Sequence, residues 1–124
     1  MFLPPLPQGQ EHPEEVRVPH NAVSHEETQV WLMPVFTARA GSEAALHEAL
    51  VGLQTASRRD TGCLEYTVFS DDQRPDTFIL FEGWASHEDL KAHNEEDHVK
   101  AFVEGVQSLL VSPFSVTPIT PLAS

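Results

Sequence analysis

Two residues that could take part in binding or catalysis lie two positions apart in an apolar segment. Glu82 and Trp84 lie at i and i+2 within residues 77–84, and on a β-strand such side chains point to the same face. A carboxylate and a flat aromatic ring could then flank a planar ligand. The alternative for Trp84 is plain core packing, which is common for a tryptophan on a strand. A carboxylate is costly to bury without a partner, so Glu82 is expected to serve either structure or function.

A histidine follows nine residues beyond this tryptophan. An imidazole has an ordinary pKa of about 6.5, which would suit His93 to take a proton from a phenol-type hydroxyl. The alternative is a surface histidine at a helix end. His98 is five residues further on, about 140° around a continuous helix, so the two share a face only if the helix is interrupted. The segment lacks the i, i+4 histidine pair of a helical zinc site, and we expect a solvated acidic break there and no metal.

Two more residues precede the apolar segment. Tyr66 is a pocket candidate with the same ambiguity as Trp84, because its hydroxyl needs a partner wherever it is buried. Cys63 is expected to be a small buried residue rather than a reactive thiolate, since no base is adjacent in sequence. The candidates are therefore His93 and Glu82 as catalytic residues, with Trp84, Tyr66 and His98 as substrate contacts.

Hydrophobic periodicity predicts the elements that must position these residues. We expect an α+β fold with strands at 29–39, 63–70, 77–85 and 114–119, and helices at 43–59, 86–93 and 97–110. The order is β-α-β-β-α-β with a broken second helix. This is the ferredoxin-like plan, a four-stranded antiparallel sheet with helices on one face.

Local signals add detail to this plan. Pro34 removes a ladder hydrogen bond and predicts a bulge or an unpaired backbone group. Ser42 and Ser86 are the expected N-caps of the first two helices, and Pro113 is expected to end the last helix. Along the second strand, alternation predicts that one face carries Leu64, Tyr66 and Val68.

The N-terminal segment and the net charge limit the kinds of partner that this protein is expected to have. Residues 1–28 are rich in proline and glutamate and are expected to form a flexible arm, with the folded domain at 29–122. A formal charge of −12 disfavours nucleic acid and anionic membrane partners. A lone cysteine, no leader-like start and no membrane-length apolar run favour the cytoplasm.

The third strand also predicts assembly. Phe78 and Leu80 lie on one face with Glu82, while Ile79 and Phe81 lie on the other, so both faces are apolar. The helices can cover only one face, and a second copy of the chain is the simplest cover for the other.

The same residues prompt a family resemblance. Residues 62–66 read Gly-Cys-Leu-Glu-Tyr and residues 81–86 read Phe-Glu-Gly-Trp-Ala-Ser. Followed by His93, they resemble the antibiotic-biosynthesis-monooxygenase pattern of G-C-x-x-Y, then E-x-W-x-s, then a histidine. The resemblance covers roughly residues 29–122. It implies a dimeric ferredoxin-like α/β barrel with His93 facing a pocket.

The function implied by this resemblance is oxidation of a small quinol or polyphenol with molecular oxygen and no cofactor. His93 would deprotonate the substrate, Glu82 would orient His93 or the substrate hydroxyl, and Trp84 with Tyr66 would form flat walls. One alternative is a small-metabolite isomerase on the same fold. Another is a non-catalytic dimer for ligand binding or stress response. The haem-degrading branch of the family has an asparagine on its first strand, which residues 30–39 lack.

Overall fold

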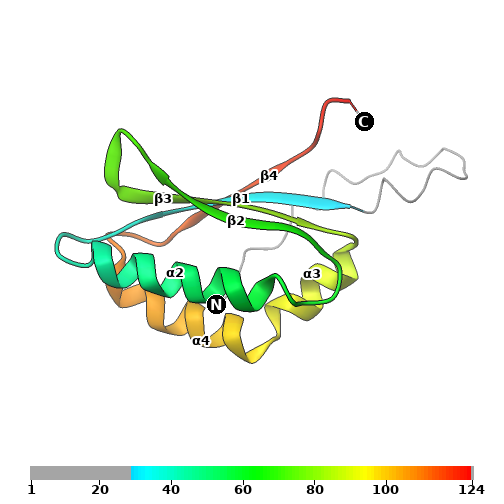
Figure 1. Ribbon diagram of the computed structural model, residues 1–124, viewed down its shortest axis with the longest axis horizontal. Coiled ribbons are helices and arrows are strands. Elements are labelled where there is room, and N and C mark those ends of the chain that lie inside the picture. The colour runs from blue at the N-terminus through cyan, green and yellow to red at the C-terminus, as the bar shows by residue number, and fades with distance from the viewer. Residues whose placement is uncertain (1–28, 124) are drawn as a thin grey trace, which may run out of the picture.

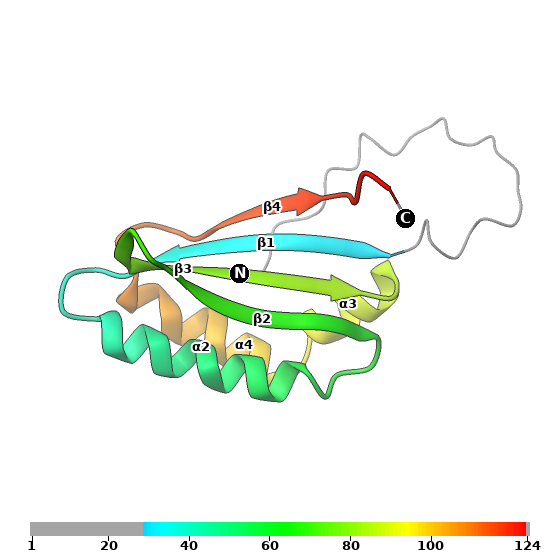
Figure 2. The same ribbon diagram turned by 45° about the horizontal axis from the view of Figure 1, so that its top comes forward.

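The computed structural model describes residues 29–123, which fold into one sheet and one layer of helices (Figures 1 and 2). The arm expected at residues 1–28 lies outside the described residues. The elements in chain order are β1 (Val30–Thr37), α2 (Glu43–Ser57), β2 (Cys63–Asp71), β3 (Arg74–Trp84), α3 (His87–Asn94), α4 (Asp97–Val106), a 3-10 turn (Gln107–Leu109) and β4 (Ser115–Ile119).

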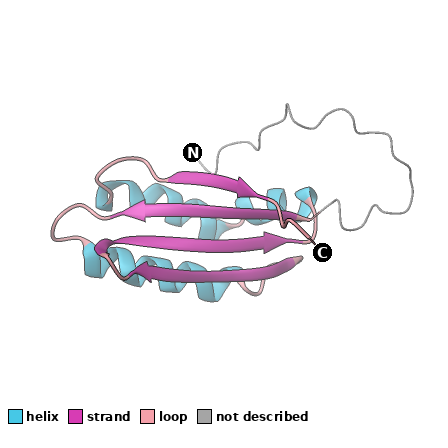
Figure 3. Ribbon diagram, turned by 90° about the horizontal axis from the view of Figure 1, so that it is seen from above, coloured by secondary structure: helices cyan, strands magenta, loops and turns pink. Residues whose placement is uncertain are grey.

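The sheet has the strand order β2-β3-β1-β4, and each neighbouring pair is antiparallel. All helices lie on one face of it, and Figure 3 looks onto the opposite face. The predicted ferredoxin-like fold class is therefore confirmed. Glu82 and Trp84 lie in the last part of β3, a central strand of the sheet, and both are buried.

The core forms between the inner face of the sheet and the inner faces of the helices. Side chains reach it at every second position of a strand and about every 3.6 positions of a helix. Along β1, alternate residues from Val30 to Phe36 are buried and those between them are half-buried. Helix α2 contributes an apolar stripe of leucines, and α4 contributes three valines on its inner face. The buried members of the two helices are Leu46, Leu50, Leu53, Ser57, Val99, Val103 and Val106.

The break between α3 and α4 follows from local capping. The hydroxyl of Ser86 accepts a hydrogen bond from the backbone N–H of Asp89 at 3.0 Å, as expected for an N-cap. Helix α3 ends at Asn94, and α4 starts three residues later at Asp97. The predicted interruption is therefore present, and it separates His93 from His98.

Some sequence-based details were wrong. Ser42 is the N-cap residue of α2 as predicted, but its side chain makes no cap hydrogen bond, and the backbone N–H of Gly41 donates to the Glu43 carboxylate at 3.0 Å. Leu64 is exposed rather than on the face of Tyr66, because the pairing register shifts between Cys63 and Glu65. The last helix ends as a regular α-helix at Val106, well before Pro113, since the chain tightens into a 3-10 turn.

Proline in β1 disturbs the ladder less than a bulge would. The pairing with β3 covers Val30–Leu32 and Val35–Thr37 in one constant register. Pro34 itself pairs with Val116 of β4. The strand therefore keeps its alternation across Pro34, and Met33 and Pro34 pair with no residue of β3, which is the second of the two outcomes expected for this proline. Among the described residues, no helix is long and apolar enough to cross a membrane.

Candidate functional site

A cavity lies between the sheet and the helices. Its volume is about 20 Å³, roughly the space needed for one water molecule. Apolar side chains line most of it, and its polar groups come from β2, β3 and α3. The lining residues are Pro34, Phe36, Leu53, Tyr66, Leu80, Glu82, His93, Val99, Phe102, Val103 and Phe114.

Glu82 is the carboxylate of this cavity. Its alternation on β3 turns it toward the helices, and it is only 1% exposed. Burial raises its pKa from 4.5 to about 7, while a hydrogen bond from Trp84 acts in the opposite direction. The indole Nε1–H of Trp84 donates to Oε1 of Glu82 at 2.7 Å. The carboxyl group is therefore poised to hold or release a proton near neutral pH.

Trp84 serves the core and the site together. The side chain is fully buried, and its ring lies 4.3 Å from that of His93 at 33°. It contacts two residues that line the cavity, Glu82 and His93, but it is not a lining residue itself. Its observed contacts position the polar groups rather than form a wall.

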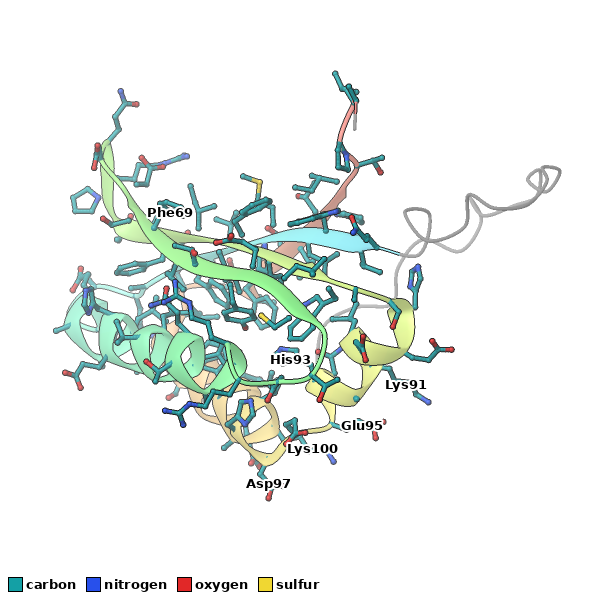
Figure 4. The ribbon with its side chains drawn as sticks, turned by 45° about the vertical axis from the view of Figure 1, so that its right-hand side comes forward. Phe69, Lys91, His93, Glu95, Asp97 and Lys100 are labelled. Atoms are coloured by element: carbon teal, nitrogen blue, oxygen red, sulfur yellow. The ribbon has the colours of Figure 1, made fainter. Side chains whose placement is uncertain are left out.

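His93 is held from the side opposite the sheet. Its Nδ1 lies 2.8 Å from Oδ2 of Asp60, in the loop between α2 and β2. The imidazole is 2% exposed, and burial lowers its pKa, although the hydrogen bond and charge of Asp60 act to raise it. Figure 4 shows His93 beneath the sheet, whereas the exposed Lys91 and Glu95 point outward.

The same carboxylate oxygen contacts a second histidine. Nε2 of His98 lies 2.9 Å from Oδ2 of Asp60, and the His93 and His98 rings are 6.1 Å apart. The break after α3 allows both rings to reach one aspartate despite their spacing of five. His98 is not among the residues that line the cavity, so its substrate contact stays a prediction without support from the geometry.

Tyr66 completes the aromatic surroundings of His93. The ring is 3% exposed and makes edge contacts with His93 at 5.5 Å and Trp84 at 6.2 Å. Burial, followed by the charge of Glu82, raises the pKa of its hydroxyl well above the ordinary value. The phenol of Tyr66 therefore stays protonated and can act as a hydrogen-bond donor.

The structure brings His93, Glu82, Trp84 and Tyr66 together and adds one residue that sequence reasoning missed. Asp60 is 33 residues from His93 and belongs to no periodic pattern. It takes the orienting position at His93 that was one of two roles expected for Glu82. Only its residue type, in a loop before a strand, offered a signal.

Basic residues lie elsewhere. Among the described residues, no arginine lines the cavity. Arg58 donates to the backbone carbonyl of Tyr66 at 2.7 Å, and Arg39 donates to that of Leu110 at 3.4 Å. Arg74 pairs with Asp71 at the hairpin turn. The cavity therefore offers no positive charge for a phosphorylated ligand.

The fold and the site together define a small ferredoxin-like protein with a buried acid–base cluster. A family model described as antibiotic biosynthesis monooxygenase matches residues 30–105, more than half of the chain. The chain belongs to this family, and the predicted resemblance is confirmed.

Similar proteins share the fold at modest identity. A structure from Mycobacterium tuberculosis is 27% identical with a TM-score of 0.74, and covers 78% of this chain and 98% of its own. One from Pseudomonas aeruginosa is 29% identical with a TM-score of 0.73, and covers 77% and 96%. An uncharacterised protein of Synechocystis sp. is 30% identical over 60 residues, which span 48% of this chain and 41% of that protein. The chain thus spans less than half of this curated relative.

Proposed function

We propose that this protein oxidises a small quinol or polyphenol with molecular oxygen, using its own side chains and no cofactor. The observation that carries this proposal is the Asp60–His93 pair at 2.8 Å, whose histidine also lines an apolar cavity beside Glu82 and Tyr66. Membership of the monooxygenase family supports the reaction class but does not fix the reaction, because one fold hosts several chemistries.

The hydrogen bond to Asp60 sets the tautomer of the base. When Nδ1–H donates to the carboxylate, Nε2 carries the lone pair and is the atom that can take a proton. The ring lines the cavity, so this is the nitrogen available to a substrate there. Because burial lowers the pKa of His93, the ring is neutral at neutral pH, as a base must be.

Deprotonation makes the substrate reactive toward oxygen. A phenolate is electron-rich, and an apolar cavity with little water leaves it reactive rather than hydrated. One oxygen atom enters the ring and the other leaves as water, so that a hydroquinone and O₂ yield a hydroxyquinone and water. Glu82, with a pKa of about 7, is placed to contact a substrate hydroxyl.

The cavity must widen to admit an aromatic ring, because its volume of about 20 Å³ suits only a water molecule. Phe102 and Phe114 line it and are half-buried. They both contact Phe36, at ring distances of 5.8 and 4.8 Å. We propose that these two phenylalanines move when substrate enters.

A homodimer is part of this proposal, and its contact is the sheet face that carries no helices.

An isomerase acting on a phosphorylated metabolite is disfavoured, because the cavity has no arginine among the described residues. A non-catalytic binding protein would bind a hydroquinone without turning it over, and the assay below distinguishes it from an enzyme.

The test is oxygen uptake with a panel of hydroquinones, run aerobically and anaerobically, with product mass as a second readout. We expect His93→Ala to lower kcat about a hundredfold or more, since a positioned base contributes that much. Asp60→Asn should also lower kcat, because an amide can present its N–H to Nδ1 and impose the wrong tautomer. The matched control is His87→Ala, whose exposed side chain lies at the start of α3.

Two results would contradict the proposal. If the unmutated protein turns over no hydroquinone while binding one, the protein is a binding module. If His93→Ala retains full oxygen-dependent turnover, the base is another group, and Glu82 is then the next candidate.

A further inference from the structure

A cluster of three ligand-type side chains lies beside the cavity. Asp60, His93 and His98 each offer one ligand atom, and these atoms all lie within 4.8 Å of one another. They come from the α2–β2 loop, the end of α3 and the start of α4. The sequence led us to expect no metal here, because residues 93–98 lack a helical histidine pair, but Asp60 adds a third ligand atom. We propose that this Asp60–His93–His98 cluster binds a divalent transition-metal cation of the zinc class, and that the bound ion switches off His93.

The donor set matches that chemistry. Neutral imidazole nitrogens suit zinc, copper, iron and nickel, and a carboxylate completes a set of two histidines and one acid. Three protein ligands with an open position are typical of reactive zinc sites. Glu95, Glu96 and Asp97 are exposed in and next to the linker between the two helices, and their charges raise the local concentration of cations.

Metal binding requires the three side chains to rearrange. The two nitrogen–oxygen distances are 2.8 and 2.9 Å, whereas ligand atoms at about 2.0–2.1 Å from a tetrahedral zinc are about 3.3 Å apart. The two nitrogen–oxygen distances must therefore widen by about half an ångström, and the two histidine nitrogens, which lie within 4.8 Å of each other, must approach to about the same 3.3 Å. The side chains of Asp60 and His98 are 11% and 28% exposed, so they can move and the ion can enter from solvent.

A hydrogen-bonded junction between two helices is the alternative role for the same residues. In that role the aspartate accepts an N–H from each ring, and nothing more is required. The substitution His98→Gln separates the two roles, because the glutamine amide can still donate to Asp60 but is a poor metal ligand.

Metal binding at Nδ1 has a consequence for His93. The proton of a neutral ring must move from Nδ1 to Nε2 when the metal takes the Nδ1 lone pair. Nε2 then carries a hydrogen and cannot accept the substrate proton. This consequence depends on the proposed function, whereas the binding of the ion does not.

Binding is measured first, with the full chain and Zn²⁺ or Co²⁺ alone. Titration calorimetry and the Co²⁺ absorption spectrum report affinity, and ring ¹⁵N NMR reports which nitrogen of His93 is metallated. We expect His98→Gln to weaken binding by about tenfold or more, since loss of even an outer contact to a ligand has an effect of 10–100-fold. His87→Ala is the matched control, and it should bind as the unmutated chain does.

Equal Zn²⁺ affinity in the unmutated chain and in His98→Gln would overturn the site, as would Zn²⁺ bound without a shift of the His93 Nδ1 resonance.

The effect of Zn²⁺ on turnover is tested in a separate experiment. If hydroquinone oxidation is found, Zn²⁺ should lower kcat of the His87→Ala control at least tenfold at saturation, and a chelator should restore it. Zn²⁺ bound at His93 with unchanged kcat would overturn the switch. Absence of turnover would count against the proposed function and leave the binding measurement decisive for the site.

Discussion

At the scale of single residues, burial decides the chemistry of the site. Glu82 and His93 are both almost inaccessible to solvent, and burial disfavours the charged form of each. It raises the pKa of the acid and lowers that of the histidine. Both groups can therefore be neutral near pH 7, which is how a small apolar cavity can accommodate two titratable side chains without an ion pair between them.

Glu82 should make stability depend on pH. Its pKa is 4.5 ordinarily and about 7 in the folded protein, so folding favours the protonated form. Its stabilising contribution is fully present below pH 4.5 and is lost as pH rises through about 7. The shift corresponds to about 3 kcal/mol of unfolding free energy. Glu82→Gln preserves an acceptor for Trp84 and should remove this dependence.

The measurement is urea unfolding of both proteins from pH 4 to pH 9. The difference between variant and unmutated protein isolates Glu82 from the other carboxylates. We expect Glu82→Gln to become relatively more stable as pH rises, with most of the change below pH 8. A difference that is constant with pH would show that Glu82 ionises in the folded protein as it does in the unfolded chain.

At the scale of elements, the site depends on the short helix α3 and on the loop that precedes β2. Helix α3 has only eight residues, and an isolated helix of that length is not stable in water. Its N-cap and its packing must therefore hold His93 in place. Gly62, near Asp60 in the same loop, has a positive φ of 81°, a conformation that glycine adopts readily. A Cβ there would also collide with Asp89 of α3.

The N-cap of α3 gives a direct test. Ser86→Ala removes the hydroxyl that accepts from the Asp89 N–H at 3.0 Å. We expect a loss of about 1 kcal/mol of stability, together with faster hydrogen exchange in α3. Ser42→Ala is the matched control, because Ser42 makes no side-chain cap hydrogen bond, and its effect should be a few tenths of a kcal/mol at most. Equal losses in the two variants would show that the Ser86 hydroxyl adds nothing specific.

At the scale of the whole molecule, one face of the sheet is apolar and carries no helices. The strands direct half-buried or exposed side chains to this face, and Phe69 is 52% exposed on it (Figure 4). The rings of Trp31 and Phe81 stack there at 5.5 Å. The further members of the face are Met33, Val35 and Ile79. A second copy of the chain would cover these side chains through a symmetric contact.

We therefore predict a homodimer that depends on this face. Analytical ultracentrifugation at micromolar concentration should give twice the mass of one chain. Phe69→Glu should shift the mass toward the monomer, because a charge would be buried in the contact. Val51→Glu is the matched control, since Val51 is 45% exposed on helix α2. A monomeric mass for the unmutated protein would contradict the dimer.

The order of elements and the residues that alternate toward the core could be predicted from the sequence pattern. Glu82 and Trp84 share a face because strand geometry repeats every two residues, and their hydrogen bond spans only two positions. The cap at Ser86 and the break near Asn94 follow from neighbouring residues as well. Such features depend on interactions within a few positions of the chain, which a sequence pattern records.

The completion of the site depends on contacts between residues far apart in the chain. Asp60 reaches His93 and His98 across 33 and 38 residues, and no local period links these positions. The register shift that exposes Leu64 and the missing cap at Ser42 were also invisible in the sequence. The physical reason is that these contacts depend on how the α2–β2 loop packs against the α3–α4 break. That packing is set by the whole core and not by the residues next to Asp60 in the chain.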